Sequence, residues 1–196
     1  MKWGQGFCAA AALSGGVLTL CVVLAACAPK ATLPVLGKVP PFQLTSQTGE
    51  TFERKALDGH VWVADFMFTS CPGPCPRMSS QMHAIQTATA ADTPDVKLVS
   101  FTVDPEHDSP EVLAAYGKHF LAQPGRWLFL TGPQNRLDEI GRTGFKLNPV
   151  DGSLDHSTRF VLVDRAARIR GYYASSDDGF PSRLLRDLRQ LEREKL

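Results

Sequence analysis

The sequence predicts an α/β domain: a central mixed sheet, mostly parallel, flanked by helices and preceded by an N-terminal β-hairpin extension. Three observations carry this prediction. Apolar runs of strand length alternate with polar segments of helical length, an order typical of a parallel sheet covered by helices. Residues 41–52 alternate apolar and polar side chains around a turn signal at 47–50, as a hairpin does. Two apolar runs separated only by a short turn at 164–167 predict an antiparallel edge.

Local patterns justify the individual elements. Asp58-Gly59 marks a turn into the first buried strand, and Ser109-Pro110 offers an N-cap followed by a proline at the first helical position. One face of the last helix carries leucines at helical spacing: Leu184, Leu185, Leu188 and Leu191. The prediction places strands at 61–68, 96–103, 127–130, 159–163 and 168–173, and helices at about 76–90, 110–120, 135–143 and the C-terminus.

Composition restricts the class of protein. The chain has 196 residues, of which 43% are hydrophobic and 21% charged, as in a globular protein. The formal net charge is +1, so no strongly basic field indicates a nucleic-acid partner. Three of the five cysteines, Cys8, Cys21 and Cys27, lie near the N-terminus. The folded part therefore holds one cysteine pair and no disulfide framework.

The N-terminus resembles a bacterial lipoprotein signal. Lys2 precedes a mostly apolar run at 7–26, which ends in Leu24-Ala25-Ala26-Cys27. In that interpretation Cys27 becomes the lipidated first residue of the mature protein. The alternative is an uncleaved anchor helix, since the run is about long enough to span a bilayer. Both place the domain outside the cytoplasm, in a bacterial cell envelope and tethered to a membrane.

This interpretation divides the chain into three parts. Residues 1–26 form the signal peptide, 27–40 the lipidated N-terminus and a linker, and 41–196 the folded domain. Pro29, Pro34 and Pro40 and the scarcity of charges are typical of a linker.

The cysteine pair lies in the stretch Cys71-Pro72-Gly73-Pro74-Cys75-Pro76, between a predicted strand and a predicted helix. We expect both thiols to be exposed there and close to unpaired backbone N–H groups, which favour the thiolate. Thiolates at such a place attack disulfides or bind soft metals. An oxidising compartment permits a Cys71–Cys75 disulfide, so the pair needs reduction before it acts.

Three motifs in order make the chain resemble the SCO/SenC family of copper chaperones, which have a thioredoxin-like fold. The segment 71–76 is similar to the family's C-x-x-x-C-P, with Gly73-Pro74 where larger residues are frequent. The segment 104–111 is similar to D-P-x-x-D-(T/S)-P, and 155–158, before an apolar strand, to the histidine motif. The resemblance covers roughly residues 40–196.

The resemblance implies a copper site made by Cys71, Cys75 and His156. Soft thiolates favour Cu(I), two of them leave a coordination position open, and a neutral imidazole suits it. Thioredoxins usually have a cis-proline in the loop that faces the cysteines, but no proline occurs here between 150 and 164. His156, whose imidazole has a lone pair for a metal, thus takes the place of a proline, which has no backbone N–H. The implied client is a cuproprotein, the CuA site of cytochrome c oxidase.

Two alternatives remain open. A thiol–disulfide oxidoreductase could reduce client cysteines before metal insertion, although the C-x-x-x-C spacing and the missing proline count against it. A thiol peroxidase or redox sensor would need a dedicated peroxide pocket, which the sequence does not indicate. The favoured interpretation is a metallochaperone and not an enzyme.

Other residues carry weaker hypotheses. Asp65 lies in an apolar strand six residues before Cys71, so it is either buried beneath the cysteine loop with a raised pKa or turned outward to a basic partner. Asp104 is expected beside the metal loop. Packing is favoured over copper binding for Met78 and Met82. A surface location is expected for the other histidines: His60, His83, His107 and His119.

Overall fold

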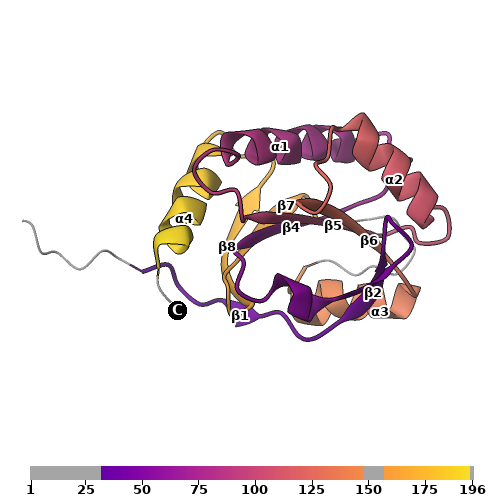
Figure 1. Ribbon diagram of the computed structural model, residues 1–196, viewed down its shortest axis with the longest axis horizontal. Helices are drawn as coiled ribbons and strands as arrows, with labels where there is room; N and C mark the ends of the chain where they lie inside the picture. The colour runs from indigo at the N-terminus through magenta and orange to yellow at the C-terminus, as the bar shows by residue number, and fades with distance from the viewer. Residues whose placement is uncertain (1–31, 148–156, 195–196) are drawn as a thin grey trace, which may run out of the picture. The chain divides into compact units, whose positions relative to one another are not determined.

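The computed structural model describes residues 32–147 and 157–194. They build one eight-stranded sheet in the order β1-β8-β7-β4-β5-β6-β2-β3 (Figure 1). The strands are β1 (Gly37–Lys38), β2 (Gln43–Ser46), β3 (Thr51–Glu53), β4 (Trp62–Met67), β5 (Lys97–Thr102), β6 (Trp127–Thr131), β7 (Arg159–Val163) and β8 (Arg168–Ala174). The helices are α1 (Pro74–Ala88), α2 (Pro110–His119), α3 (Gln134–Glu139) and α4 (Ser182–Arg193).

The sheet is mixed, as predicted, but it is not mostly parallel: among the described residues only β4–β5 and β5–β6 pair in parallel, and the other five pairings are antiparallel. β4, β5 and β6 run parallel, while β7 pairs with β4 antiparallel and returns through β8. The β2–β3 hairpin joins the other edge by pairing β2 with β6. Helices α1 and α2 cover one face of the sheet and α3 lies on the other (Figure 1). The predicted α/β class and the hairpin extension are therefore confirmed.

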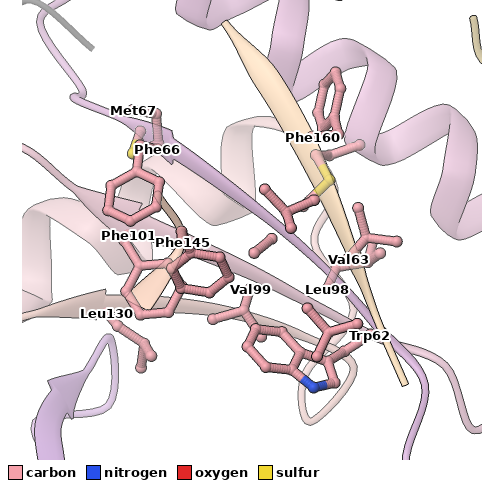
Figure 2. Close-up of a cluster of buried hydrophobic side chains, with 14 of the residues drawn as sticks. Trp62, Val63, Phe66, Met67, Leu98, Val99, Phe101, Leu130, Phe145 and Phe160 are labelled. Atoms are coloured by element: carbon pink, nitrogen blue, oxygen red, sulfur yellow. The ribbon is translucent and has the colours of Figure 1, made fainter. Parts of the chain in front are cut away.

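β4 is buried along its whole length, because both faces of a central parallel strand are covered. Its Phe66 stacks on Phe101 of β5 with ring centroids 5.1 Å apart. Phe145, which follows α3, packs edge-on against Phe66 and Trp62 (Figure 2). Such aromatic pairs contribute about 0.5–1.5 kcal/mol each beyond their buried area. This cluster holds β4 rigidly, and the cysteine loop leaves from its end.

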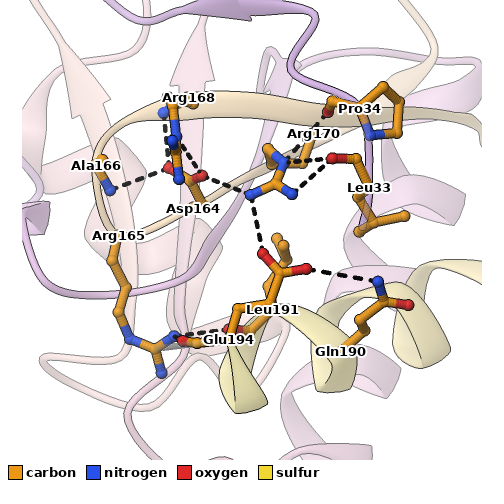
Figure 3. Close-up of polar contacts among 10 residues, drawn as sticks. All are labelled: Leu33, Pro34, Asp164, Arg165, Ala166, Arg168, Arg170, Gln190, Leu191 and Glu194. Atoms are coloured by element: carbon orange, nitrogen blue, oxygen red, sulfur yellow. Dashed lines mark hydrogen bonds and ion pairs between the residues drawn. The ribbon is translucent and has the colours of Figure 1, made fainter. Parts of the chain in front are cut away.

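The folded unit begins earlier than predicted. It starts at Leu33, not at 41, because β1 pairs with β8 through Gly37 and Lys38. Arg170, a nearly buried residue, donates to the carbonyl oxygens of Leu33 and Pro34 at 2.6 and 3.2 Å (Figure 3). The last residues of the predicted linker thus belong to the sheet.

Other differences are small. α1 begins at Pro74, two residues before the predicted start, and α3 continues into a π turn at Ile140–Gly144. Within the described ranges no helix combines the length and apolarity needed to cross a bilayer. The predicted signal peptide, Cys27 and His156 lie outside the described residues.

Candidate metal centre

The cysteine loop connects the end of β4 to the start of α1. Cys75 lies in the first turn of α1, whereas Cys71 precedes the helix by three residues. The loop, and not a shared helical face, therefore brings the two thiols together. No disulfide joins them, and both are buried, with 8% of Cys71 and 0% of Cys75 exposed.

Burial changes the protonation expected for the Cys75 thiol. The pKa of Cys75 is raised, chiefly because burial disfavours the thiolate. A backbone hydrogen bond from Phe68 lowers this pKa. The hydrogen bond with the Cys71 thiol and the charge of the nearby Asp65 carboxyl both raise it. The expected exposure is thus wrong for both cysteines, and the expected stabilised thiolate is wrong for Cys75. A metal ion bound here would have to displace the thiol proton.

Asp108 fixes the cysteine loop to the sheet. Its side chain is fully buried and accepts hydrogen bonds from the Thr69 backbone N–H at 3.2 Å and from the hydroxyls of Thr69 and Thr102. Thr69 lies two residues before Cys71, and Thr102 ends β5. Three donors therefore satisfy a buried carboxylate and join the D-P-x-x-D-S-P segment to the cysteine loop.

Asp104 lies beside this anchor, at the end of β5. Its backbone N–H donates to the Thr102 hydroxyl at 2.9 Å, and its Oδ1 lies 2.8 Å from Nδ1 of His107. The pKa of His107 is raised because its ring hydrogen-bonds to the Asp104 carboxylate. The His107 side chain is 75% exposed, as expected of a surface residue.

Asp65 points inward. Its side chain is fully buried, and burial raises the pKa of its carboxyl from 3.8 to about 7. Oδ1 accepts from the Ser100 hydroxyl at 2.6 Å, and Ser100 in turn accepts from Trp127 Nε1 at 3.0 Å. Oδ2 has no hydrogen-bond partner among the described residues. The buried alternative of the Asp65 hypothesis is therefore confirmed over the outward one.

The remaining neighbours pack around the pair. Met78 and Met82 are fully buried in the core, which confirms packing as their role. The Ser79 hydroxyl lies 2.8 Å from the Tyr116 hydroxyl, and burial raises the pKa of Tyr116. Thr69, Asp108 and Tyr116 were not predicted as site residues. Only Asp108 carried a signal, because it stands inside the second motif.

Ser175 bridges α1 to the start of β7. The side chains of Arg77 and Gln81 in α1 donate to the hydroxyl and the carbonyl oxygen of Ser175, at 3.1 and 2.9 Å. The backbone N–H of Ser175 donates to the Thr158 carbonyl at 2.9 Å. Because β7 runs antiparallel to β4, its first residues lie at the edge where β4 ends. Thr158, two positions after His156, is therefore held against the helix that carries Cys75.

Two of the three predicted copper ligands are in the described part of the chain. There, no group of three or more metal-ligating side chains occurs, and Cys71 and Cys75 stand as a pair. The other histidines lie apart. His60 Nδ1 lies 3.0 Å from the Asp95 carbonyl oxygen, and His119 packs against Phe120.

The sequence model of the SCO1/SenC family matches residues 33–192 of this chain. The chain belongs to the SCO1/SenC family. The match begins at the residue where the folded unit begins.

Solved structures of SCO1/SenC relatives share the fold. A SCO1/SenC family lipoprotein of Bacillus anthracis is 34% identical, with a TM-score of 0.75 over 82% of this chain and 98% of that one. BsSco, described as having a disulfide switch and belonging to the Sco family of cytochrome c oxidase assembly proteins, is 30% identical, with a TM-score of 0.74 over 84% and 99%. ScoI of Bradyrhizobium japonicum, solved with copper bound, is 25% identical, with a TM-score of 0.65 over 79% and 99%. The thioredoxin-like fold implied by the resemblance is thereby confirmed.

Proposed function

We propose that this SCO1/SenC protein is a copper metallochaperone that holds copper through Cys71, Cys75 and His156. Two thiolates and an imidazole form a soft donor set that suits Cu(I). The copper-bound ScoI relative supports the choice of metal. Copper is the cargo, and the thiol protons leave as it binds.

One observation carries the ligand assignment. Ser175 connects Thr158 to Arg77 and Gln81 of α1, so the strand that follows His156 is fastened to the helix that contains Cys75. His156 lies two positions before Thr158, a span of at most about 7 Å. This short reach supports His156 as the third ligand.

Delivery proceeds by ligand exchange with a client cuproprotein. One protein thiolate at a time is replaced by a client ligand, so copper is never released into solution. The buried pair suits this role, because a thiol enclosed by packed side chains is protected from other metals and oxidants. The proposed client is the CuA site of cytochrome c oxidase, in line with the assembly role given for BsSco.

The proposed setting is the bacterial cell envelope, with Cys27 lipidated and anchored in a membrane. The B. anthracis relative is described as a lipoprotein, which supports this. Labelled palmitate should be incorporated into the full chain and lost in Cys27→Ala. A lipid-free product that retains Met1 would contradict the proposal.

Copper titration of the reduced protein tests the ligands. Cys71→Ser, Cys75→Ser and His156→Ala should each lower copper affinity by more than about tenfold, since even partners outside the ligand set matter by 10- to 100-fold. His107→Ala is the matched control, because His107 is near the loop and exposed. Loss of copper in His107→Ala with retention in His156→Ala would overturn the assignment.

A second candidate function is thiol–disulfide exchange with client cysteines. The contact between the Cys71 and Cys75 thiols favours it, as does the disulfide switch described for BsSco. In this reaction the pair attacks a client disulfide, becomes a Cys71–Cys75 disulfide and leaves two client thiols. Rapid catalytic reduction of insulin with weak copper binding would favour this function, and stoichiometric copper with negligible turnover would favour the chaperone.

A further inference from the structure

α4 carries a basic face on its outer side. Its inner side is buried through Leu184, Leu188 and Leu191. The opposite side presents arginines at i, i+3 and i+7, which lie on one face of a helix. This basic face consists of Arg186, Arg189 and Arg193 and, with Ser182 and Leu185, lines a shallow depression of about 320 Å³.

The charge of the basic face is directed outward. Among the described residues, Arg186 pairs only with its neighbour Asp187, whose carboxylate is 14% exposed and also accepts from the Tyr173 hydroxyl. Arg193 is exposed and has no ion-pair partner among the residues that the structure describes. Arg189 pairs with Asp92 at the surface, and exposed pairs of this kind contribute little. The face therefore retains positive charge for an external partner.

The basic face lies where the N-terminal tether leaves the folded unit. Arg170 donates to the Leu33 carbonyl at 2.6 Å and pairs with Glu194, directly after α4, at 3.2 Å (Figure 3). Six peptide steps separate Cys27 from Leu33, and a chain of that length spans at most about 22 Å. A lipid on Cys27 thus keeps the end of α4 close to the membrane surface.

The same end of the domain is remote from the cysteine loop. Arg189 donates to the carbonyl of Ala88, the last residue of α1, at 3.0 Å. Cys75 lies in the first turn of that helix, about 20 Å away at the helical rise per residue. A partner on the basic face would leave the cysteines accessible to a client.

We propose that the basic face of α4 rests on the anionic phospholipid headgroups of the membrane that anchors the chain. The inference rests on the proposed lipidation of Cys27. Arginine guanidinium groups pair well with phosphate, and clustered basic residues beside an anchor bind anionic lipid surfaces. A lipid surface fits better than an acidic protein, because the short tether already brings that surface within reach.

Arginine modification in vesicles tests the proposal. The lipidated full chain is reconstituted into vesicles of phosphatidylcholine alone or mixed equally with phosphatidylglycerol, then treated with phenylglyoxal and mapped by mass spectrometry. Modification of Arg186 and Arg193 should fall about fivefold in the anionic vesicles and recover in high salt. Arg136, which is 54% exposed on α3, should be unaffected.

A double variant sharpens the result. In Arg186→Gln/Arg193→Gln, modification of Arg189 should become equal in both vesicles, whereas the control Lys55→Gln/Arg136→Gln should keep the lipid dependence. Equal modification of the wild-type face in both vesicles overturns the proposal, as does protection that requires an added protein. Recovery of the chain in the supernatant would show that it is not anchored in the vesicles, and this result also overturns the proposal. Copper titration of the same sample reports separately on the proposed function.

Discussion

At the scale of residues, buried acidic groups distinguish this site from an ordinary thiol pair. Asp65 is held in the core by one hydroxyl, while Asp108 is held by three donors that include the cysteine loop itself. The first arrangement raises the pKa of the Asp65 carboxyl, and the second gives the Asp108 side chain a hydrogen-bond donor on each of its oxygens. The two aspartates therefore have different expected behaviour on mutation.

Asp65 should make stability depend on pH. Its pKa rises from 3.8 to about 7 on folding, because burial penalises the charge. A raised pKa gives stability that is present below about pH 4 and lost as the pH rises through about 7. Asp65→Asn removes this loss, so relative to wild type it should gain up to roughly 4 kcal/mol between pH 4 and pH 8.

Urea unfolding at the two pH values measures this gain. Asp178→Asn, at an exposed position, is the control and should show no such gain. A constant difference between wild type and Asp65→Asn across the range would show that Asp65 is already charged at pH 4.

Asp108 should matter for the shape of the loop. Asp108→Asn turns an amide NH₂ toward donors that need an acceptor, which costs about 1–3 kcal/mol of folding free energy. We also expect weaker copper binding and faster hydrogen exchange at Thr69, because the loop loses its fixed position. Glu106→Gln, two residues away and exposed, should behave as wild type. Unchanged exchange at Thr69 in Asp108→Asn would contradict the anchoring role.

At the scale of elements, the buried guanidinium of Arg170 fastens the segment that leads into β1. Arg170→Met removes the donor to the carbonyls of Leu33 and Pro34 and the ion pair of Glu194, whereas Asp164 keeps its ion pair with Arg168. We expect a loss of about 3 kcal/mol. The backbone amides of Leu36 and Val39 donate to carbonyls of Ile169 and Ala167. Their hydrogen exchange should accelerate by more than the loss of global unfolding free energy explains.

The exposed pair Arg136–Glu139 supplies the comparison for Arg170. Arg136→Met should cost less than about 1 kcal/mol and leave the exchange of β1 unchanged. Equal effects of the two substitutions would mean that Arg170 does not anchor β1.

The elements also show what could be predicted from the sequence. The six residues of β4 form an apolar run that indicates a buried strand, and Ser109-Pro110 marks the start of α2 correctly. β1 has only two residues and no alternation, so nothing local distinguishes it from a linker. Its partner is β8, which is more than a hundred residues away in the sequence.

The same limit applies to the site. The spacing of Cys71 and Cys75 predicts a pair, but their burial in the core depends on tertiary packing, which has no local signature in the sequence. Thr69 and Asp108 are 39 residues apart, and a single sequence does not show that they meet. The thiolate expectation failed for this reason, because desolvation is a tertiary effect.

At the scale of the whole molecule, the sheet separates the two ends of the domain. β1 pairs with the first residues of β8, whereas Ala174 near the end of β8 lies opposite Arg159, the start of β7. β1 therefore lies at the end of the strands where β4 begins, and the cysteine loop leaves from the opposite end, where β4 ends.

This separation sets a working height. Along β8 from Ile169 to Ala174 the backbone rises about 17 Å, and no flexible joint interrupts it. If Cys27 is anchored as proposed, this rise sets the cysteine loop back from β1, and the segment between Cys27 and Leu33 adds at most about 22 Å to its distance from the membrane. We expect such a chain to serve clients whose metal site stands within that range of heights above the bilayer. Selection among clients can then be made by height, before any side chain is recognised.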